Sequence, residues 1–547
     1  MTAPSRFPGP LAGALRGLLA PALCFAAACA HAPDAGTGDA RAPAAAAAPA
    51  PAPVPDDLSR IRADVETLLA AQAEATWTSW TTGAPLDAAR PAQGREWLLD
   101  GSALRALDAQ PPAADPAEAA RRRMLRDFLV GERLAAAAGS GAEPPDLSFP
   151  YEGRVVALRD SASLLAAEPD AARREALDAA RAPAALRASR AADASARALA
   201  EGAARAGLGD LPALAAGLRG ESLDALAALA GATLDATGPA YCAVMDALSR
   251  SEVGVPIARS SSRDLPRILR AAHEPRAHPA SRLVDDGRAA ALAATGEPLE
   301  ARVRLDARSA AAKSQRPLAV PVAVPGDVRI SARPSGGASE SRAFLHELGV
   351  ALYLSSIRAP ELEPRRLGTP AAPEVWGYLL EGLAADPAWL NERSGLAGHA
   401  LAREIRASQA DRLHAARMQA ARLLREVERA RGGEAGPAGD ARVLSRTLCR
   451  TVGAEEAARW PLARDPLLGS ADALRAALLA AQLEVRLAAE GNGPWWRWRG
   501  AATWLAGRWA PGSPESVAGL LRATGVDAVS PAALAQTSRS RFDAAGW

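Results

Sequence analysis

The chain has 547 residues, of which 49% are hydrophobic and 23% are charged, and these proportions exclude a protein that is disordered throughout. The 64 basic and 62 acidic residues leave a formal net charge of +2. The chain therefore lacks the basic excess that would indicate a nucleic-acid partner. Alanine is the commonest residue, and because it has the highest intrinsic helix propensity, the composition favours helices.

The N-terminus has the pattern of an export signal. Basic residues precede an apolar run over residues 18–28, which is too short to span a bilayer as a helix. Small residues then stand directly before Cys29, as in the bacterial lipobox, in which the cysteine is acylated. Ala26 replaces the leucine that is usual three positions before that cysteine. We expect a signal peptide over 1–28, and a plain secretory signal cleaved near the same point is the alternative.

The following segment, 29–56, is rich in alanine and proline and predicts a semi-rigid tether that forms no core. A tether after an acylated cysteine predicts an exported protein that Cys29 anchors to the membrane, on the periplasmic face of a bacterial cell envelope. In an oxidising compartment Cys242 and Cys449 could form a disulfide, but nothing in the sequence indicates whether they lie close together.

The remainder reads as one helix after another, interrupted by proline and glycine. Helices are expected over 57–72, 84–137 with a break at Pro111-Pro112, 154–206 with boundaries at Pro169 and Pro183, 221–249, 341–357, 373–386, 396–431, 442–452 and 471–490. A loop is expected over 139–150 and an irregular segment over 253–279. We divide this part of the chain into an N-terminal helical part, 57–315, and a second part, 316–547.

One short stretch of the second part predicts β-structure. Two β-branched runs, 318–324 and 328–331, flank a Pro-Gly-Asp turn and indicate a hairpin. Pro321 cannot donate a hydrogen bond to a neighbouring strand, which places its strand at the edge of the sheet. The predicted fold class is therefore mainly α, with a small β-hairpin or sheet just before the helix that begins near 341.

That helix carries the residues that point to chemistry. His346-Glu347 has the form of the start of a zincin motif, in which two histidines four positions apart bind zinc and the glutamate activates the metal-bound water. The second histidine position is Val350. A His-Glu pair by itself occurs by chance, and a partly buried histidine in a helix is the alternative interpretation.

A second helix supplies carboxylates. Glu374 and Glu381 are separated by two helical turns and share one helix face. In zincins of the gluzincin type, a glutamate on a second helix is the third zinc ligand, and Glu374 stands at about the expected spacing from His346. The predicted edge strand also fits, because an extended peptide can bind along such an edge.

With these features the chain resembles the thimet oligopeptidase and oligoendopeptidase F family of zinc metallopeptidases, which carries His-Glu-x-Gly-His-x-x-His and then a helix with two glutamates. The segments 165–170 and 520–534 are also similar to family patterns. The resemblance implies an oligoendopeptidase-like helical clamshell around a channel. It implies His346 and Glu374 as zinc ligands and Glu347 as general base, and 316–547 as the metallopeptidase-like part.

The chain departs from the family at decisive positions. Val350 cannot bind a metal, the family's third histidine is Tyr353, and the stretch 467–474 lacks the tyrosines that contact the reacting carbonyl in family members. Catalytic zinc normally has three protein ligands and one open position. Without the metal, no water of low pKa is available to Glu347. The losses indicate an impaired or repurposed site.

Several residues are alternative ligands or neighbours of this site. Rescue of zinc binding would have to come from Tyr353, Glu381, His399 or His414, and Tyr378 is a further neighbour on the second helix. We expect His273 and His278 to lie in an exposed loop, because Pro275 prevents a zincin helix there. The tryptophans of 495–509 are expected to pack against C-terminal helices, the alternative being a carbohydrate or membrane surface.

Two functions follow from these features. The first is an exported lipoprotein that resembles a zinc oligopeptidase but lacks peptidase activity, and that binds peptides or a protein partner in the channel without a metal. The second is an active zinc metalloendopeptidase in which a replacement ligand completes the zinc site. A cell-envelope protein that shares only ancestry with the peptidases is a third, less specific possibility.

Overall fold

The computed structural model describes residues 57–87, 89–138, 147–433, 436–460, 462 and 465–546. The predicted signal peptide, the tether and Cys29 lie outside these residues, so export and lipid anchoring stay predictions. In the described ranges, no helix is both long enough and apolar enough to cross a membrane.

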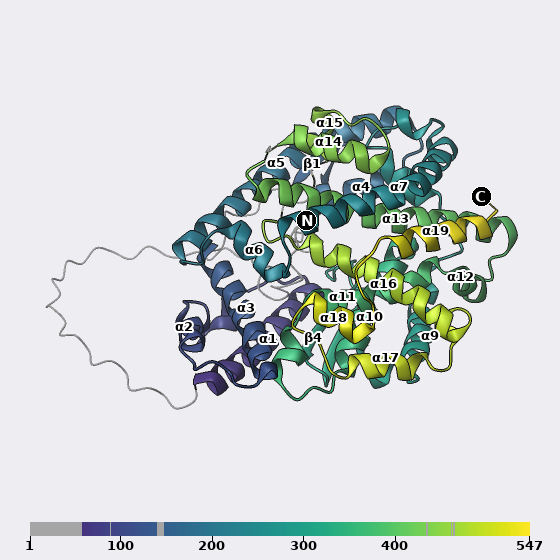
Figure 1. Ribbon diagram of the computed structural model, residues 1–547. Coiled ribbons are helices and arrows are strands. Elements are labelled where there is room, and N and C mark those ends of the chain that lie inside the picture. Colours follow the sequence, from purple (N-terminus) through teal and green to yellow (C-terminus); the bar gives the residue numbers. More distant parts are fainter. Residues whose placement is uncertain are drawn as a thin grey trace, which may run out of the picture.

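Helices dominate the described chain, as predicted, and the strands are few and short (Figure 1). The first half contains α1 (Asp57–Thr82), α2 (Ser102–Asp108), α3 (Pro116–Ala138), β1 (Ser148–Tyr151), β2 (Arg154–Ala157), α4 (Ser161–Ala167), α5 (Ala171–Arg205), α6 (Leu211–Arg219), α7 (Leu223–Val253), α8 (Leu265–Ala271) and α9 (Leu283–Thr295). Local signals set several boundaries. Asp170 and Ser222 begin α5 and α7 by accepting hydrogen bonds from backbone N–H groups in the first turn.

Several predictions for this half are wrong. The described residues of 83–101 contain only the short turns η2 (Arg90–Ala92) and η3 (Glu96–Leu98), β1 begins within the predicted loop, and α8 lies within the segment expected to be irregular. The segment 154–157 is not helical, because Arg154–Ala157 pairs antiparallel with β1. Glu152 and Gly153 both have positive φ and form the two-residue turn that a tight hairpin requires. Pro183 does not end a helix but lies inside α5.

The second half contains β3 (Arg304–Asp306), β4 (Leu318–Ala323), β5 (Asp327–Ser331), α10 (Ala338–Ser356), the π-turn η8 (Glu363–Leu367), α11 (Ala371–Glu381), α12 (Pro387–Ser394), α13 (Gly398–Ala430), α14 (Pro437–Leu448), α15 (Ala454–Arg459), α16 (Ser470–Gly491), α17 (Ala501–Trp509), α18 (Val517–Thr524) and α19 (Ala532–Ala544). The helices α10, α11, α13, α14 and α16 agree with the predicted ones to within about five residues, whereas α12, α15, α17, α18 and α19 were not predicted. The predicted hairpin is confirmed as β4 and β5, which pair antiparallel from Leu318 and Ser331 onward.

The sheet has the order β3-β5-β4, so β4 is an edge strand, as Pro321 predicts. The parallel strand β3 was not expected, because three residues carry too little pattern to indicate a strand. Behind the sheet, α10 and α11 pack against α9, α16 and α17 around a core that contains Trp376 and Trp509. Trp495 and Trp504 are also buried there, which confirms that the tryptophans pack against the C-terminal helices.

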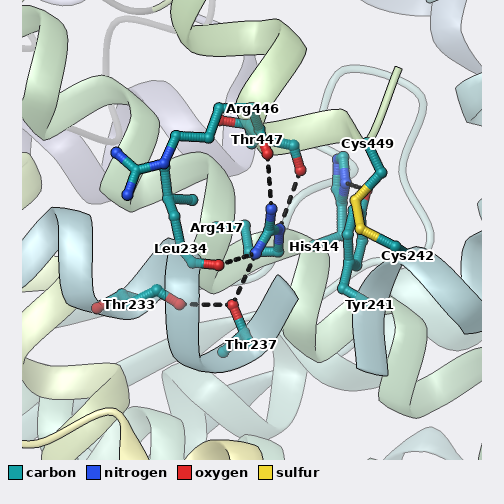
Figure 2. The surroundings of a disulfide bond; sticks show 10 residues. All are labelled: Thr233, Leu234, Thr237, Tyr241, Cys242, His414, Arg417, Arg446, Thr447 and Cys449. Carbon is teal, nitrogen blue, oxygen red and sulfur yellow. Dashed lines mark hydrogen bonds between the residues drawn. A yellow bond between two sulfur atoms is a disulfide. The ribbon is translucent and has the colours of Figure 1, made fainter. Parts of the chain in front are cut away.

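A second core joins α7, α13 and α14, and a disulfide links two of these helices. Cys242 of α7 and Cys449, directly after α14, have Cα atoms 5.6 Å apart and are bonded, which settles the pairing that the sequence left open. Figure 2 shows the buried guanidinium of Arg417 beside it. Arg417 donates to the carbonyl oxygens of Leu234 at 2.6 Å and Thr447 at 2.9 Å, so one side chain of α13 holds α7 and α14.

Removal of this disulfide is expected to destabilise the protein. The bond closes a loop of 207 residues, and cross-links of long loops contribute roughly 2–5 kcal/mol to the free energy of unfolding. The double variant C242A/C449A should therefore unfold at a lower guanidinium concentration than the wild type. Addition of reductant should lower the wild-type midpoint and leave the variant unchanged. Equal midpoints for the two proteins under oxidising conditions would contradict this expectation.

Candidate active site

The candidate site lies where α10 and α11 cross closely. Gly349 permits this approach, because a Cβ there would lie 2.7 Å from the carbonyl carbon of Trp376 and 2.9 Å from the Cα of Gly377. Gly377 in turn leaves room for the ring of His346, whose Nε2 would be 2.8 Å from an added Cβ. Two glycines thus bring the motif histidine of α10 against the glutamates of α11.

His346 is held between the two predicted glutamates. Its Nε2 lies 3.2 Å from a carboxylate oxygen of Glu374, and its Nδ1 lies 3.1 Å from one of Glu381. Arg342, one helical turn before His346, donates to Glu381 at 2.6 Å and 3.0 Å. The ring of Tyr378 meets that of His346 edge to face, with centroids 4.7 Å apart. The sequence correctly predicted that these side chains come together, but it gave no role to Arg342.

The two carboxylates favour the imidazolium form of His346. Burial alone would lower its pKa, but the hydrogen bonds from the ring to Glu374 and Glu381 outweigh burial and raise the pKa to about 10. Burial would raise the pKa of Glu381, but the charge of Arg342 and the bond from His346 lower it to about 2. At neutral pH the group is a partly buried ion cluster in which both ring nitrogens donate.

This pKa predicts a pH dependence of stability. The folded-state pKa of His346 lies above the ordinary value of 6.5, so its contribution is fully present below about pH 6.5 and is lost as the pH rises toward 10. In that window His346 should contribute a slope of about 1.4 kcal/mol per pH unit. Urea unfolding at intervals from pH 6 to 10 measures the slope, and the variant H346Q should show a shallower one. Parallel profiles for the two proteins would refute this reading of the cluster.

Glu347, the predicted general base, is buried and contacts the edge strand. Its carboxylate accepts a hydrogen bond from the backbone N–H of Ala319 in β4 at 2.9 Å. This contact binds the helix that carries the motif to the sheet edge. The sequence placed the strand beside the helix but could not predict the bond, which depends on how the two elements pack.

A cavity of about 540 Å³ opens in front of these residues. Its walls come from α1 and α3 on one side and from β4, α10 and α11 on the other, with the end of α6 and the segment 513–517 completing them. Glu347, Val350 and Glu374 line it, so Val350 presents an apolar side chain where the resemblance would place a second zinc ligand. The volume is typical of ligand sites.

The other predicted neighbours lie elsewhere. Tyr353 is buried in the core, where its hydroxyl meets that of Ser513 at 2.9 Å. His399 is exposed near the start of α13. His414 bonds Tyr241 at 2.8 Å beside the disulfide, and burial lowers its pKa to about 4 (Figure 2). None of these three side chains completes a metal site with His346.

The expectation of an exposed loop for His273 and His278 is wrong. His278 is buried and His273 nearly so, and both bond Glu404 of α13, at 3.0 Å and 2.9 Å. Sequence reasoning missed this cluster because Glu404 lies far along the chain, in a helix that offers no motif. Among the residues with described positions, these three side chains form the one group of three or more potential metal ligands.

The donor set around His346 therefore does not fit a catalytic zinc ion. His346 Nε2 and Glu374 converge, but in the described part of the chain no third histidine, cysteine or carboxylate joins them within ligand distance. Catalytic zinc requires three protein ligands, and the position of the second histidine is occupied by Val350. Glu381 is on the opposite nitrogen of the ring.

Solved structures similar to this chain are peptidases by name. A PZ peptidase A with an inhibitor matches with a TM-score of 0.62 and 12% identity, over 87% of this chain and 90% of that one. A protein from Bacillus anthracis described as an oligoendopeptidase F matches with 0.59 and 12%, over 89% and 95%. An M32 carboxypeptidase from Deinococcus radiodurans matches with 0.54 and 15%, over 90% and 99%.

The sequence matches no family model and no curated protein. The structural matches nevertheless extend over nearly the whole of each neighbour, and they confirm the predicted fold. The chain has the helical oligoendopeptidase-like fold of metallopeptidases of the thimet oligopeptidase type.

Proposed function

We propose that this protein is a peptidase-like peptide-binding protein that does not hydrolyse its ligand. The observation that carries the proposal is the state of the motif histidine. Both nitrogens of His346 bond carboxylates, and Val350 takes the place of the second zinc ligand. Without a third ligand the site lacks the means to hold the zinc ion that such hydrolysis uses.

The ligand that the cavity favours is an extended peptide. Residues 318–321 of β4 line it, and an edge strand recognises peptide backbone through main-chain hydrogen bonds. Apolar side chains such as Leu69, Val350 and Leu354 stand beside charged ones such as Arg123, so the cavity could accept mixed side chains. A flexible segment of a protein partner would bind by the same chemistry.

We place the protein at the periplasmic face of the cell envelope, anchored through Cys29. The apolar run before that cysteine and the tether after it support this placement. The disulfide Cys242–Cys449 supports it independently, because such bonds persist in oxidising compartments.

An active zinc peptidase is the second candidate, and one contact favours it. The 3.2 Å between His346 Nε2 and Glu374 is close to the separation of two ligand atoms on one zinc ion. Glu381 on Nδ1 would then be the carboxylate that orients a metal-binding histidine. Hydrolysis by this route would need a third ligand from water or from the substrate.

Peptide binding and hydrolysis are tested together with a randomised octapeptide library. We expect the wild type and E347Q to retain the same peptides with similar affinity, and mass spectrometry to recover these peptides intact. Cleavage by the wild type that E347Q abolishes would establish the second candidate instead.

A pair of variants on α1 tests whether the cavity is the binding site. Thr76 lines the cavity, whereas Thr78 on the same helix is exposed and does not. T76W should fill the cavity and weaken peptide binding at least tenfold, and T78W is the matched control. Equal binding by both variants would place the peptide site elsewhere on the protein.

A further inference from the structure

A cluster of potential metal ligands lies apart from the residues that line the cavity. His273 and His278 come from the irregular segment after α8, and Glu404 comes from the second turn of α13. The three offer Nδ1, Nε2 and a carboxylate oxygen, all within 4.8 Å of one another. Side-chain exposure is 10% for His273, 6% for His278 and zero for Glu404, so the ligand atoms are sheltered but one edge remains accessible.

The donor set and its dimensions suit zinc. Two imidazoles and a carboxylate are a common protein ligand set for Zn²⁺, with bonds of about 2.0–2.2 Å. Tetrahedral bonds of that length place ligand atoms about 3.3–3.6 Å apart. One oxygen of Glu404 lies 2.9 Å from His273 Nδ1 and 3.0 Å from His278 Nε2, and all three ligand atoms lie within 4.8 Å of one another, so small side-chain shifts would admit the ion.

The surrounding groups resemble the outer shell of a metal site. Asp411 accepts from Nε2 of His273 at 3.1 Å and orients the ring, so Nδ1 becomes a ligand when the ion displaces the proton that it shares with Glu404. Ser408 donates to the ligating oxygen of Glu404 at 2.8 Å, and the backbone N–H of Glu274 donates to the other oxygen at 2.8 Å. His273 and Glu404 are thus held in place before any ion arrives.

We propose that His273, His278 and Glu404 bind one zinc ion that fastens the segment 272–279 to α13. The carbonyl oxygen of His278 accepts from the backbone N–H of Gly337 at 2.8 Å, directly before α10. The bound ion therefore also holds the beginning of the motif helix.

A chain of buried charges connects this site to the candidate active site. Asp411 bonds His273 on one side and pairs with Arg342 at 3.0 Å on the other, and Arg342 bonds the Glu381 that holds His346. Loss of the ion would remove a positive charge that both Glu404 and, through His273, Asp411 face. We expect a change at the zinc site to alter the order of the α10 segment that contains Arg342.

Zinc binding to the full chain, purified without a histidine tag and stripped with a chelator, tests the proposal. Isothermal titration with Zn²⁺ should give one site in the wild type. H278A should weaken the affinity at least 100-fold, and D411N, which removes only the orienting carboxylate, should weaken it roughly 10–100-fold. Co²⁺ should give the visible absorption of a tetrahedral site in the wild type and not in H278A.

Two controls separate this site from others. H399A removes an exposed histidine, and H346A removes the histidine of the candidate active site; neither should change the affinity for Zn²⁺. A wild type that takes up no Zn²⁺, or an affinity that H278A leaves intact, would overturn the proposal. The wild-type titration stands even if a variant fails to fold, and neither outcome bears on peptide binding in the cavity.

Discussion

Replacing Val350 with histidine is expected to create a zinc site at His346 and Glu374. The new imidazole would stand one helical turn after His346 on the face that lines the cavity, and it would supply the missing third ligand. Glu381 already bonds the far nitrogen of His346 and is itself held by Arg342, so the outer shell is in place. Loss of an outer-shell partner alone lowers metal affinity roughly 10–100-fold. We therefore expect V350H to bind Zn²⁺ at this site more than about 100-fold tighter than the wild type does.

The measurement is a Zn²⁺ titration of V350H in the H278A background, which removes the other proposed zinc site. Addition of E374Q should abolish the gain and serves as the control that assigns the ion to this pair of helices. A V350H protein that folds and gains no affinity would show that the geometry around His346 has diverged together with the ligand.

A second large effect is expected from Gly349→Ala, this time on stability. The added methyl group would lie 2.7 Å from the carbonyl carbon of Trp376, inside contact distance with the backbone of α11. Overpacking against backbone typically costs 1–3 kcal/mol, and here neither helix can yield without moving His346, so we expect a loss of about 3 kcal/mol. Guanidinium unfolding measures the loss.

Gly507 offers the matched control for this substitution. It lies inside α17, is exposed, and has no atom within 4 Å of an added Cβ. G507A should raise stability by about 0.5–1 kcal/mol, because alanine has the higher helix propensity. If G349A and G507A change the free energy of unfolding by the same amount, close packing of α10 on α11 is not what positions the site.

Much of the site could be predicted because residues close together in the sequence determine it. His346 and Glu347 share one helix, and the spacing of Glu374 and Glu381 fixes them on one face of the next. The hairpin could also be predicted, because β-branched runs flank a turn. Local pattern and resemblance together gave the fold class, the edge strand and the pairing of α10 with α11.

The missed features depend on distant packing. Glu404 lies more than a hundred positions from His273 and carries no motif, so nothing in the sequence joined it to the two histidines. Nothing in the sequence joined Arg342 to Asp411 either, because they belong to different helices. The disulfide across 207 residues was a possibility that the sequence could not decide. The strand Arg154–Ala157 was missed because an alanine-rich surrounding sequence favours helix, while a positive-φ turn decides the local structure.

We expect that the pair His346 and Glu374 holds no zinc. The zinc content per chain tests this expectation directly. The measurement uses the full chain without a tag, as wild type, H346A and H278A, analysed by mass spectrometry for the metal. We predict that H346A contains as much zinc as the wild type and that only H278A loses it. A wild type that contains zinc which H346A loses and H278A keeps would contradict this expectation and identify His346 as a zinc ligand.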